Sequence, residues 1–130
     1  MGGLTLDTGA LIALERARKR IREVLAVAQA GKDPITVPVA AVAEWWRGPD
    51  KRRLLIREMF AVEPLDEALA KTAGEAIASL RRGTDVDARL TIDAIVMASA
   101  ARRGDVVYTS DVDDLGRFGG FFPNVRIFSV

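Results

Sequence analysis

Short apolar runs alternate with longer amphipathic segments along the chain, and this order limits the available folds more than any other feature. Strands that alternate with helices form a parallel sheet with helices on both faces. We therefore predict an α/β/α arrangement of three layers around a mainly parallel sheet of four or five strands. The runs that predict strands are LTL, ITVPV, AVEPL, DVVYTS and VRIFSV, at residues 4–6, 35–39, 61–65, 105–110 and 125–130.

The segments between these runs predict helices, and polar residues or glycines mark their ends. Short polar side chains accept hydrogen bonds from the free N–H groups of a first turn, so Thr8, Asp66 and Thr91 are expected to cap three helices. Gly31 and Gly83 are expected to end the helices that start at residues 20 and 67, because glycine readily leaves helical geometry. The predicted helices cover residues 8–17, 20–31, 40–46, 50–60, 67–83 and 92–104.

Composition bounds both the domain organisation and the chemistry. The chain has 130 residues, 49% of them hydrophobic, which predicts one domain over residues 1–130 with a real core. It contains neither cysteine nor histidine, which excludes disulfides, thiolate zinc sites and Ser-His-Asp triads. No apolar stretch approaches the roughly 20 residues that span a membrane, and the N-terminus lacks the basic region of a signal peptide. We therefore expect a soluble, cytoplasmic protein.

The net charge is only +1, but the charges are unevenly distributed. Basic residues gather in 15–22, 47–57, 81–82 and 102–103. Such clusters are most often solvated helix faces, although they also attract nucleic acids. Without Cys or His, catalysis would have to rest on carboxylates, Lys, Arg, Tyr, Ser or Thr.

Four acidic residues fall near the carboxyl ends of predicted strands, where sites form in open parallel sheets. Asp7 ends the first strand, Asp111 follows the fourth, and Glu44 and Asp93 lie near the starts of predicted helices. Each has another explanation alone: a helix cap, a turn, a surface position, or a charge favoured by a helix dipole. No basic residue adjoins Asp7 or Asp93 in sequence. Four carboxylates at one edge therefore predict a site for a hard divalent cation, which prefers oxygen ligands.

The segment YTSDVDDL adds two further carboxylates to this edge. Asp111, Asp113 and Asp114 occupy three of four consecutive positions, although a turn needs only one. Asp111 is the expected ligand, and Asp114 is expected to cap the next turn. A calcium loop of the EF-hand kind is excluded, because its fifth and twelfth positions would be Leu115 and Phe122.

Three segments together resemble the PIN-domain nucleases, and most closely the VapC-type toxins of bacterial toxin–antitoxin operons. The resemblance covers nearly the whole chain, and its most specific part is TIDAIVMASAARRGDVVYTSDVDDL. It implies a PIN-like fold and a ribonuclease that depends on Mg²⁺ or Mn²⁺. The segments are LDTGALIAL, VAAVAEWWRG and LTIDAIVMASAARRGDVVYTSDVDDL, at residues 6–14, 39–48 and 90–115.

The resemblance also assigns roles to residues of this chain. The four catalytic acids of the family fall on Asp7, Glu44, Asp93 and Asp111. Of these, all but Glu44 are the expected metal ligands, with Asp113 or Asp114 as a further candidate. The supporting hydroxyl residues would be Thr8, Thr109 and Ser110.

The resemblance implies partners as well: an RNA substrate, a small antitoxin protein and a second copy of the chain in a homodimer. Basic residues that closely follow Glu44 are the candidates for binding RNA. Adjacent tryptophans could stack on bases, but they more often fill a core or an interface. The RNA-binding candidates are Arg47, Lys51, Arg52 and Arg53, and the apolar residues that favour association are Trp45, Trp46, Leu54, Leu55, Met59 and Phe60.

Three other functions remain to be weighed. A PIN nuclease of housekeeping RNA maturation would share the fold and the site. A catalytically silent module that binds RNA or protein would share only the fold. A response-regulator receiver domain also gathers acids at strand ends, but it needs a lysine after a late strand, and no lysine follows Lys71.

Overall fold

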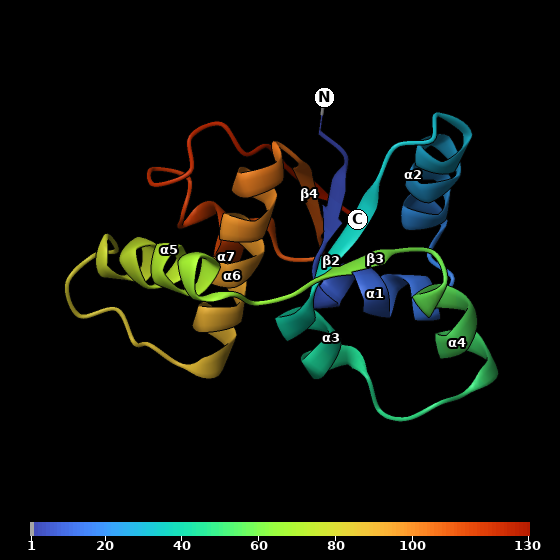
Figure 1. Cartoon of the computed structure of the whole chain (residues 1–130), viewed down its shortest axis with the longest axis horizontal. Coiled ribbons are helices and arrows are strands. Elements are labelled where there is room, and N and C mark those ends of the chain that lie inside the picture. Colours follow the sequence, from blue (N-terminus) through green and yellow to red (C-terminus); the bar gives the residue numbers. More distant parts are fainter. Residues whose placement is uncertain (1) are drawn as a thin grey trace.

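The computed structural model describes residues 2–130 and contains one five-stranded sheet in which every strand pairing is parallel (Figure 1). The order of the strands is β3-β2-β1-β4-β5. This confirms the prediction of a parallel sheet with four or five strands. The strands are β1 (Leu4–Leu6), β2 (Ile35–Pro38), β3 (Ala61–Glu63), β4 (Val106–Thr109) and β5 (Ile127–Ser129).

Seven helices accompany the described strands, one more than the sequence predicts. The additional one is the short helix that follows β4, where the sequence predicts only a turn. The helices are α1 (Thr8–Glu15), α2 (Lys19–Ala30), α3 (Val39–Trp45), α4 (Lys51–Arg57), α5 (Glu67–Ala78), α6 (Ala88–Arg103) and α7 (Val112–Gly116). Within residues 2–130, no helix is both long enough and apolar enough to cross a membrane.

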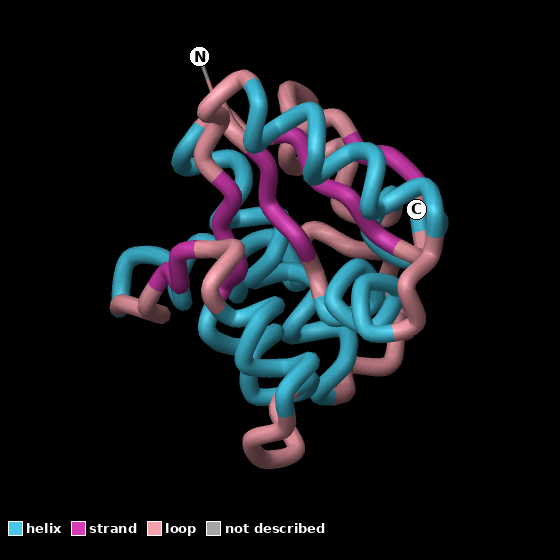
Figure 2. The backbone as a smooth tube through the Cα atoms, turned by 90° about the vertical axis from the view of Figure 1, so that its right-hand side faces the viewer, coloured by secondary structure: helices cyan, strands magenta, loops and turns pink. Residues whose placement is uncertain are grey.

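The helices cover both faces of the sheet, so the molecule has two apolar cores. One core joins β1 and β2 to α1, α2 and α4, and its fully buried side chains include Leu11 and Ile21. The other joins β4 to α5, α6 and α7, with Met97 and Phe118 fully buried. Figures 1 and 2 show the strands between these two groups of helices, as in a three-layer domain.

Two predicted helix caps are wrong, and correcting them changes where functional residues lie within their helices. Asp7, not Thr8, caps α1, because its side chain accepts a hydrogen bond from the backbone N–H of Ala10. Asp87, not Thr91, caps α6, which begins one turn earlier than predicted. Both corrections follow the ordinary preference for aspartate as a cap. The predicted cap at Asp66 is confirmed.

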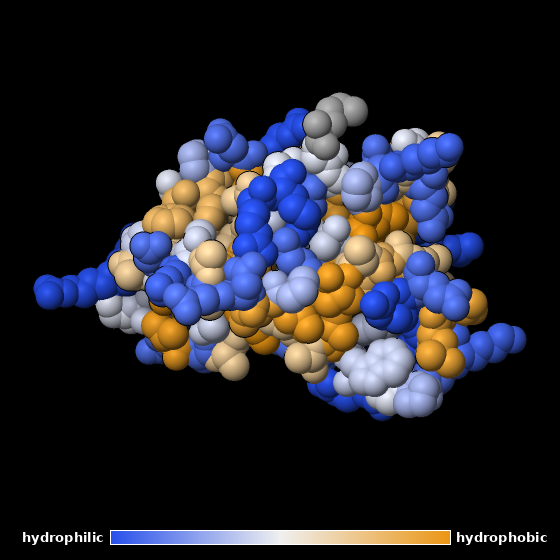
Figure 3. Space-filling model, in the orientation of Figure 1, coloured by the Kyte–Doolittle hydropathy of each residue, from blue (hydrophilic) through white to orange (hydrophobic). Residues whose placement is uncertain are grey.

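The apolar residues around α4 divide between core and surface. Trp45 is only 3% exposed and contacts Trp46 and Phe60 edge-on, with ring centroids 5.7 and 6.1 Å apart. Leu54 and Leu55 are 51% and 57% exposed, and Figure 3 shows apolar atoms over α4 among hydrophilic neighbours. Trp45 is therefore a core residue and is not available to stack on bases.

The order of the strands places a crevice beside the first one. The chain passes from β1 to β2 and β3 on one side, and then crosses over to β4 and β5 on the other. Leu4 of β1 consequently pairs with both Ile35 and Val106. Ligands of open α/β sheets bind beyond the carboxyl ends of the strands at such a switch point. The residues that follow β1 and β4 are Asp7 and the Ser110–Asp111 pair.

Candidate active site

A cavity of about 380 Å³ opens beyond the carboxyl ends of β1 and β4. The structure brings the four acids singled out in the sequence to its wall, from four different elements. Asp113 does not line it and is exposed. The charged residues around the cavity are Asp7, Glu44, Asp93, Asp111 and Asp114, together with Arg47 and Arg89.

Asp7 is held rigidly at the bottom of this cavity, where it is only 8% exposed. Its Oδ1 accepts from the N–H of Ala10 at 2.9 Å, and its Oδ2 accepts from the hydroxyl of Thr109 at 2.5 Å. Burial raises the pKa of Asp7 above its ordinary value, and these two hydrogen bonds only partly oppose that effect. The nearby charges of Glu44 and Asp111 raise the pKa further.

Asp93 is the least compensated carboxylate of the group. Because α6 begins at Ala88, Asp93 lies in the second turn, beyond the first turn where a helix dipole favours negative charge. Its Oδ2 is buried and has no hydrogen-bond partner among residues 2–130. Burial, followed by the charges of Asp7 and Asp114, raises the pKa of Asp93 to about 7, although Arg89 opposes the shift.

Glu44 reaches the cavity from α3 and is tied to α1. The hydroxyl of Thr8 donates a hydrogen bond to its Oε1 at 2.5 Å. Thr8 therefore orients an acid of the cavity instead of capping its own helix. The half-buried position of Glu44 agrees with its place in an apolar stretch of sequence.

Asp111 is fixed by the turn that leads from β4 to α7. Its N–H donates to the hydroxyl of Thr109 at 2.9 Å, and its Oδ1 accepts from the N–H of Asp114 at 3.1 Å. Asp111 is thus the cap of α7, and the expectation that Asp114 caps the turn is wrong. The hydrogen bonds from Asp114 lower the pKa of Asp111, and this pairing raises the pKa of Asp114.

Gly9 allows α1 to lie directly against this turn. A Cβ atom at residue 9 would stand 2.0 Å from the hydroxyl oxygen of Ser110, far inside van der Waals contact. Ser110 is exposed at the rim of the cavity. The close approach brings the carboxylates that follow β1 and β4 into one site.

Two arginines reach the cavity, and sequence reasoning missed one of them. Arg89 lies on α6 one turn before Asp93, so the two share a helix face. Its guanidinium is 3.7 Å from both Asp111 and Asp114, but it is exposed. A predicted helix that began at Ala88 would have placed Arg89 on the same helix as Asp93. Arg47 also lines the cavity, and its guanidinium donates to the carbonyl of Trp46.

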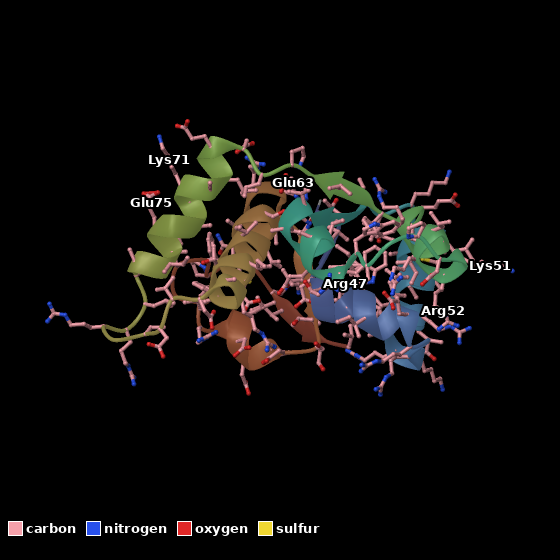
Figure 4. All side chains as sticks on the ribbon, turned by 90° about the horizontal axis from the view of Figure 1, so that it is seen from below. Arg47, Lys51, Arg52, Glu63, Lys71 and Glu75 are labelled. Atoms are coloured by element: carbon pink, nitrogen blue, oxygen red, sulfur yellow. The ribbon has the colours of Figure 1, made fainter. Side chains whose placement is uncertain are left out.

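The other predicted RNA-binding residues lie away from the acids. Figure 4 shows Arg47 near the middle of the molecule, and Lys51 and Arg52 at one end by α4. The guanidinium of Arg52 donates to the carbonyl of Glu15. Arg53 forms ion pairs with Glu15 at 3.4 Å and Asp50 at 2.8 Å, so its charge is already balanced.

The residues of the cavity suit a divalent cation in kind. Their oxygens are hard ligands, and the buried, unpartnered Oδ2 of Asp93 calls for a positive charge beside it. The side chains are not yet gathered around one point: among residues 2–130, no three acids stand in positions that would hold a metal ion together. Hydrogen bonds to Thr109, Ala10 and Thr8 occupy oxygens of Asp7 and Glu44 instead.

The chain matches one protein family by sequence and several solved structures by fold. The model of the PIN domain family matches residues 4–120. Comparison with curated proteins finds no significant sequence match. Among solved structures, a chain of DNA-bound VapBC from Salmonella typhimurium is similar with a TM-score of 0.73 and 21% identity, over 99% of this chain and 98% of that one.

Two further structures have the same fold. A chain of VapBC2 from Rickettsia felis, bound to a promoter DNA fragment, has a TM-score of 0.72 and 14% identity, with 98% of each chain covered. A chain of FitAcB from Neisseria gonorrhoeae has a TM-score of 0.60 and 21% identity, with 96% of each chain covered. At these identities the likeness is one of fold.

Proposed function

Because this chain belongs to the PIN domain family, we propose that it is a metal-dependent endoribonuclease that acts as the toxin of a toxin–antitoxin pair. One observation carries the proposal most strongly. Asp93 holds a buried carboxylate oxygen with no partner among the described residues, beside buried Asp7, at the switch point of the sheet. Such an arrangement costs stability unless a cation completes it.

Asp7, Asp93 and Asp111 would hold Mg²⁺ or Mn²⁺, with Asp114 as a further ligand. When bound, the cation would supply a Lewis acid for the phosphodiester. The oxygens of Asp7 would exchange a hydrogen bond for a metal contact. Asp113 is less suited, because it does not line the cavity.

The chain's own residues would orient the substrate and handle a proton. Before metal binds, Asp93 has a pKa of about 7 and can hold a proton close to neutral pH, and it must lose that proton to hold the cation. Thr109 holds Asp7 through its hydroxyl and receives the N–H of Asp111, so it fixes two acids at once. Arg89 and Arg47, at the wall of the cavity, would attract the phosphate of the substrate.

An antitoxin is the proposed regulator. The similar structures are complexes, VapBC and FitAcB, and this chain exposes Leu54, Leu55 and Met59 around α4. We propose that the antitoxin covers part of this apolar surface and inserts a basic side chain, best an arginine, among the carboxylates. A homodimer would bury more of the same exposed apolar residues.

Cleavage of RNA by the purified chain tests the nuclease proposal. We expect cleavage with Mg²⁺ or Mn²⁺ that stops when EDTA removes the metal. Sequencing the RNA ends after controlled expression would then identify the substrate. A pure protein that leaves RNA intact with either metal contradicts the proposal.

Inhibition tests the toxin role separately from the nuclease role. If an arginine of the antitoxin pairs with the acids, high Mg²⁺ and high salt should both weaken the complex, because both compete with that pairing. The affinity of the antitoxin for wild type and for Glu44→Gln, measured at two Mg²⁺ concentrations, checks this. An affinity that neither change affects would contradict insertion into the acidic site. A nuclease that no antitoxin inhibits would instead favour housekeeping RNA maturation.

A further inference from the structure

A second cavity, of about 550 Å³, adjoins the acidic one. The two cavities share Gly9, Ile12 and Ser110 in their walls, so they lie next to each other at the start of α1. No Asp or Glu side chain lines the second cavity among the described residues, whereas five line the first. We call it the basic cavity, after its four basic residues Arg16, Arg18, Lys19 and Arg20.

The backbone between α1 and α2 gathers these four side chains. The N–H groups of Ala17 and Arg18 donate to the carbonyls of Leu14 and Ala13, which is the Schellman pattern at the end of a helix. Ala17 takes the left-handed conformation, with φ of 52°, where glycine is usual. The turn lets α2 begin at Lys19, so bases before and after it reach the same cavity.

The positive charge of the basic cavity is largely unbalanced. Within residues 2–130, no carboxylate lies within ion-pair distance of Arg16 or Arg18. Lys19 is 3.8 Å from Glu23, and both are exposed, so that pair adds little. Arg20 donates one hydrogen bond to the carbonyl of Ser129 at 2.6 Å.

The first turn of α2 adds to the same field. Arg18 at its cap position makes no side-chain capping bond, and no acid lies in the first turn, as far as residues 2–130 show. The first N–H groups of a helix carry partial positive charge and bind anions. They lie in the same chain segment as the four basic side chains.

We propose that the basic cavity binds the phosphates of the RNA strand beside the bond that the acidic site cleaves. The assignment rests on the nuclease function proposed above, and it names the path of the substrate. A strand that crosses the acidic cavity is repelled by its carboxylates, and contacts with arginine and lysine on the next phosphates offset that repulsion. The basic cavity has no aromatic residue in its wall, so it suits phosphates and not stacked bases.

This path differs from the one expected from sequence. The expected track followed Glu44, but Arg53 is already paired with two acids and Lys51 lies at the end of the molecule. Arg16 and Arg18 are exposed and, within residues 2–130, have no carboxylate at ion-pair distance. The basic cavity that they line adjoins the acidic site. We therefore assign the RNA path to the link between α1 and α2.

Binding of RNA without cleavage tests the assignment. The probe is a short, fluorescent single-stranded RNA of mixed sequence, titrated in EDTA with Arg16→Gln/Arg18→Gln and with wild type. We expect the Kd to rise about tenfold, equivalent to about 1.4 kcal/mol. The slope of log K against log salt should become shallower by about 1.4, or about 0.7 for each lost contact with a single strand.

A matched control removes the same charge elsewhere. Arg81 and Arg82 are exposed and follow α5, on the other side of α6 from α1 (Figure 1). Arg81→Gln/Arg82→Gln should change neither the Kd nor the slope. Thermal melting of both variants confirms that they fold. An equal loss in the control, or an unchanged Kd and slope in Arg16→Gln/Arg18→Gln, overturns the assignment.

Two further measurements distinguish the assignment of the basic cavity from the nuclease proposal on which it rests. Poly-glutamate that competes at lower concentration than the RNA would make the basic cavity a docking surface for an acidic protein, and would overturn the RNA assignment. Wild-type cleavage with Mn²⁺ tests the nuclease function by itself. If wild type cleaves and the variant binds RNA normally, only the cavity assignment is wrong. If wild type does not cleave but the variant binds weakly, the basic cavity still binds RNA phosphates, and the nuclease proposal fails.

Discussion

The molecule holds two groups of carboxylates, each with a buried member, Asp105 in one and Asp7 in the other, and it treats the two groups in opposite ways. One group, the paired carboxylates, consists of Glu63, Asp66 and Asp105. The other is the acidic site of Asp7, Glu44, Asp93, Asp111 and Asp114. Arginines and N–H groups meet the first group closely, whereas the second faces a cavity with two arginines at its edge.

The paired carboxylates are satisfied almost completely. Asp105 accepts from the N–H of Gly3 at 2.6 Å, the hydroxyl of Thr5 at 2.8 Å and the guanidinium of Arg103 at 3.0 Å. Arg103 also pairs with Glu63, which Arg102 reaches at 3.2 Å. None of the three paired carboxylates lines the acidic cavity.

One member of each group, Glu63 and Asp93, shifts its pKa in the opposite direction to the other. Burial acts to raise the pKa of Glu63, but hydrogen bonds from Ser99 and Arg103 outweigh it and lower the pKa. Burial of Asp93 meets no such bonds, and its pKa rises to about 7. Arginines and hydrogen-bond donors neutralise a buried acid elsewhere in this chain, but they do not neutralise Asp93 at the cavity. We take that omission as the mark of a site that a cation completes.

The largest expected effect is on activity. Asp93→Asn keeps the shape of the side chain and removes its charge, so we expect RNA cleavage to fall about 1,000-fold, or about 4 kcal/mol in transition-state stabilisation. The free energy of unfolding should stay the same or rise, because a repelled charge is lost. Cleavage rates and urea unfolding of the pure variant check both halves. Wild-type cleavage rates in Asp93→Asn would show that Asp93 is not an active-site residue.

The next effect is on stability and concerns the paired carboxylates. Arg103→Gln leaves Asp105 and Glu63 without their shared guanidinium, and loss of one partner from a buried pair costs about 3 kcal/mol. Arg102→Gln is the matched control, since its pairs are more exposed and we expect about 1 kcal/mol or less. Urea unfolding measures both. Equal losses in the two variants would mean that burial does not distinguish these pairs.

A smaller effect appears in the dependence of stability on pH. Unfolded Asp93 loses its proton near pH 3.8 and folded Asp93 near pH 7, so the folded state holds more protons between them. The free energy of unfolding should therefore fall as pH rises through that window, and level off above it. Glu63 has the opposite sign: it stabilises above its unfolded pKa, and the contribution is lost as pH falls through its lowered folded pKa.

Asp93→Asn isolates the part of the slope that belongs to the acidic site. In EDTA, we expect the variant to lose less stability than wild type between about pH 5 and pH 8. Unfolding by urea at several pH values measures this. The groups that face Asp93 and set its pKa are Asp7, Asp114, Glu44 and Arg89. Identical slopes in variant and wild type would show that Asp93 titrates normally.

The smallest expected effect belongs to Asp113. It follows the same strand as Asp111 but lies outside the cavity and is exposed. Asp113→Asn should change cleavage by about twofold at most, since exposed charges a turn away act weakly. It also serves as the charge-matched control for Asp93→Asn. A loss as large as that of Asp93→Asn would make Asp113 a ligand.

The sequence was sufficient to predict the sheet, because its signals are local. Each strand is a short apolar run, and alternation with helices demands parallel pairing. The edge where Asp7 and Asp111 meet followed from that topology. The start of α6 was missed because Asp87 and Thr91 both suit a cap, and only tertiary structure decides between them.

That one error hid part of the site. A predicted helix that starts at residue 92 leaves Arg89 outside the helix of Asp93, and it places Asp93 in the first turn, where a helix dipole favours negative charge. The basic cavity was hidden for another reason. The cluster at 15–22 was visible in sequence, but the turn at Ala17 that directs it beside Ser110 depends on a left-handed residue without glycine.

Calorimetric titration with Mn²⁺ tests most directly whether the acidic site stands uncompensated for a cation. The ligands must lose their protons, so binding should release one. We predict that wild type binds Mn²⁺ and releases close to one proton at about pH 6, falling toward none at about pH 8.5, as the raised pKa of Asp93 requires. Titration in two buffers of different ionisation enthalpy measures that release. Asp93→Asn should bind far more weakly, while Asp113→Asn should behave as wild type. Binding and proton release that are the same in Asp93→Asn as in wild type, or no binding by wild type at millimolar Mn²⁺, would contradict the account.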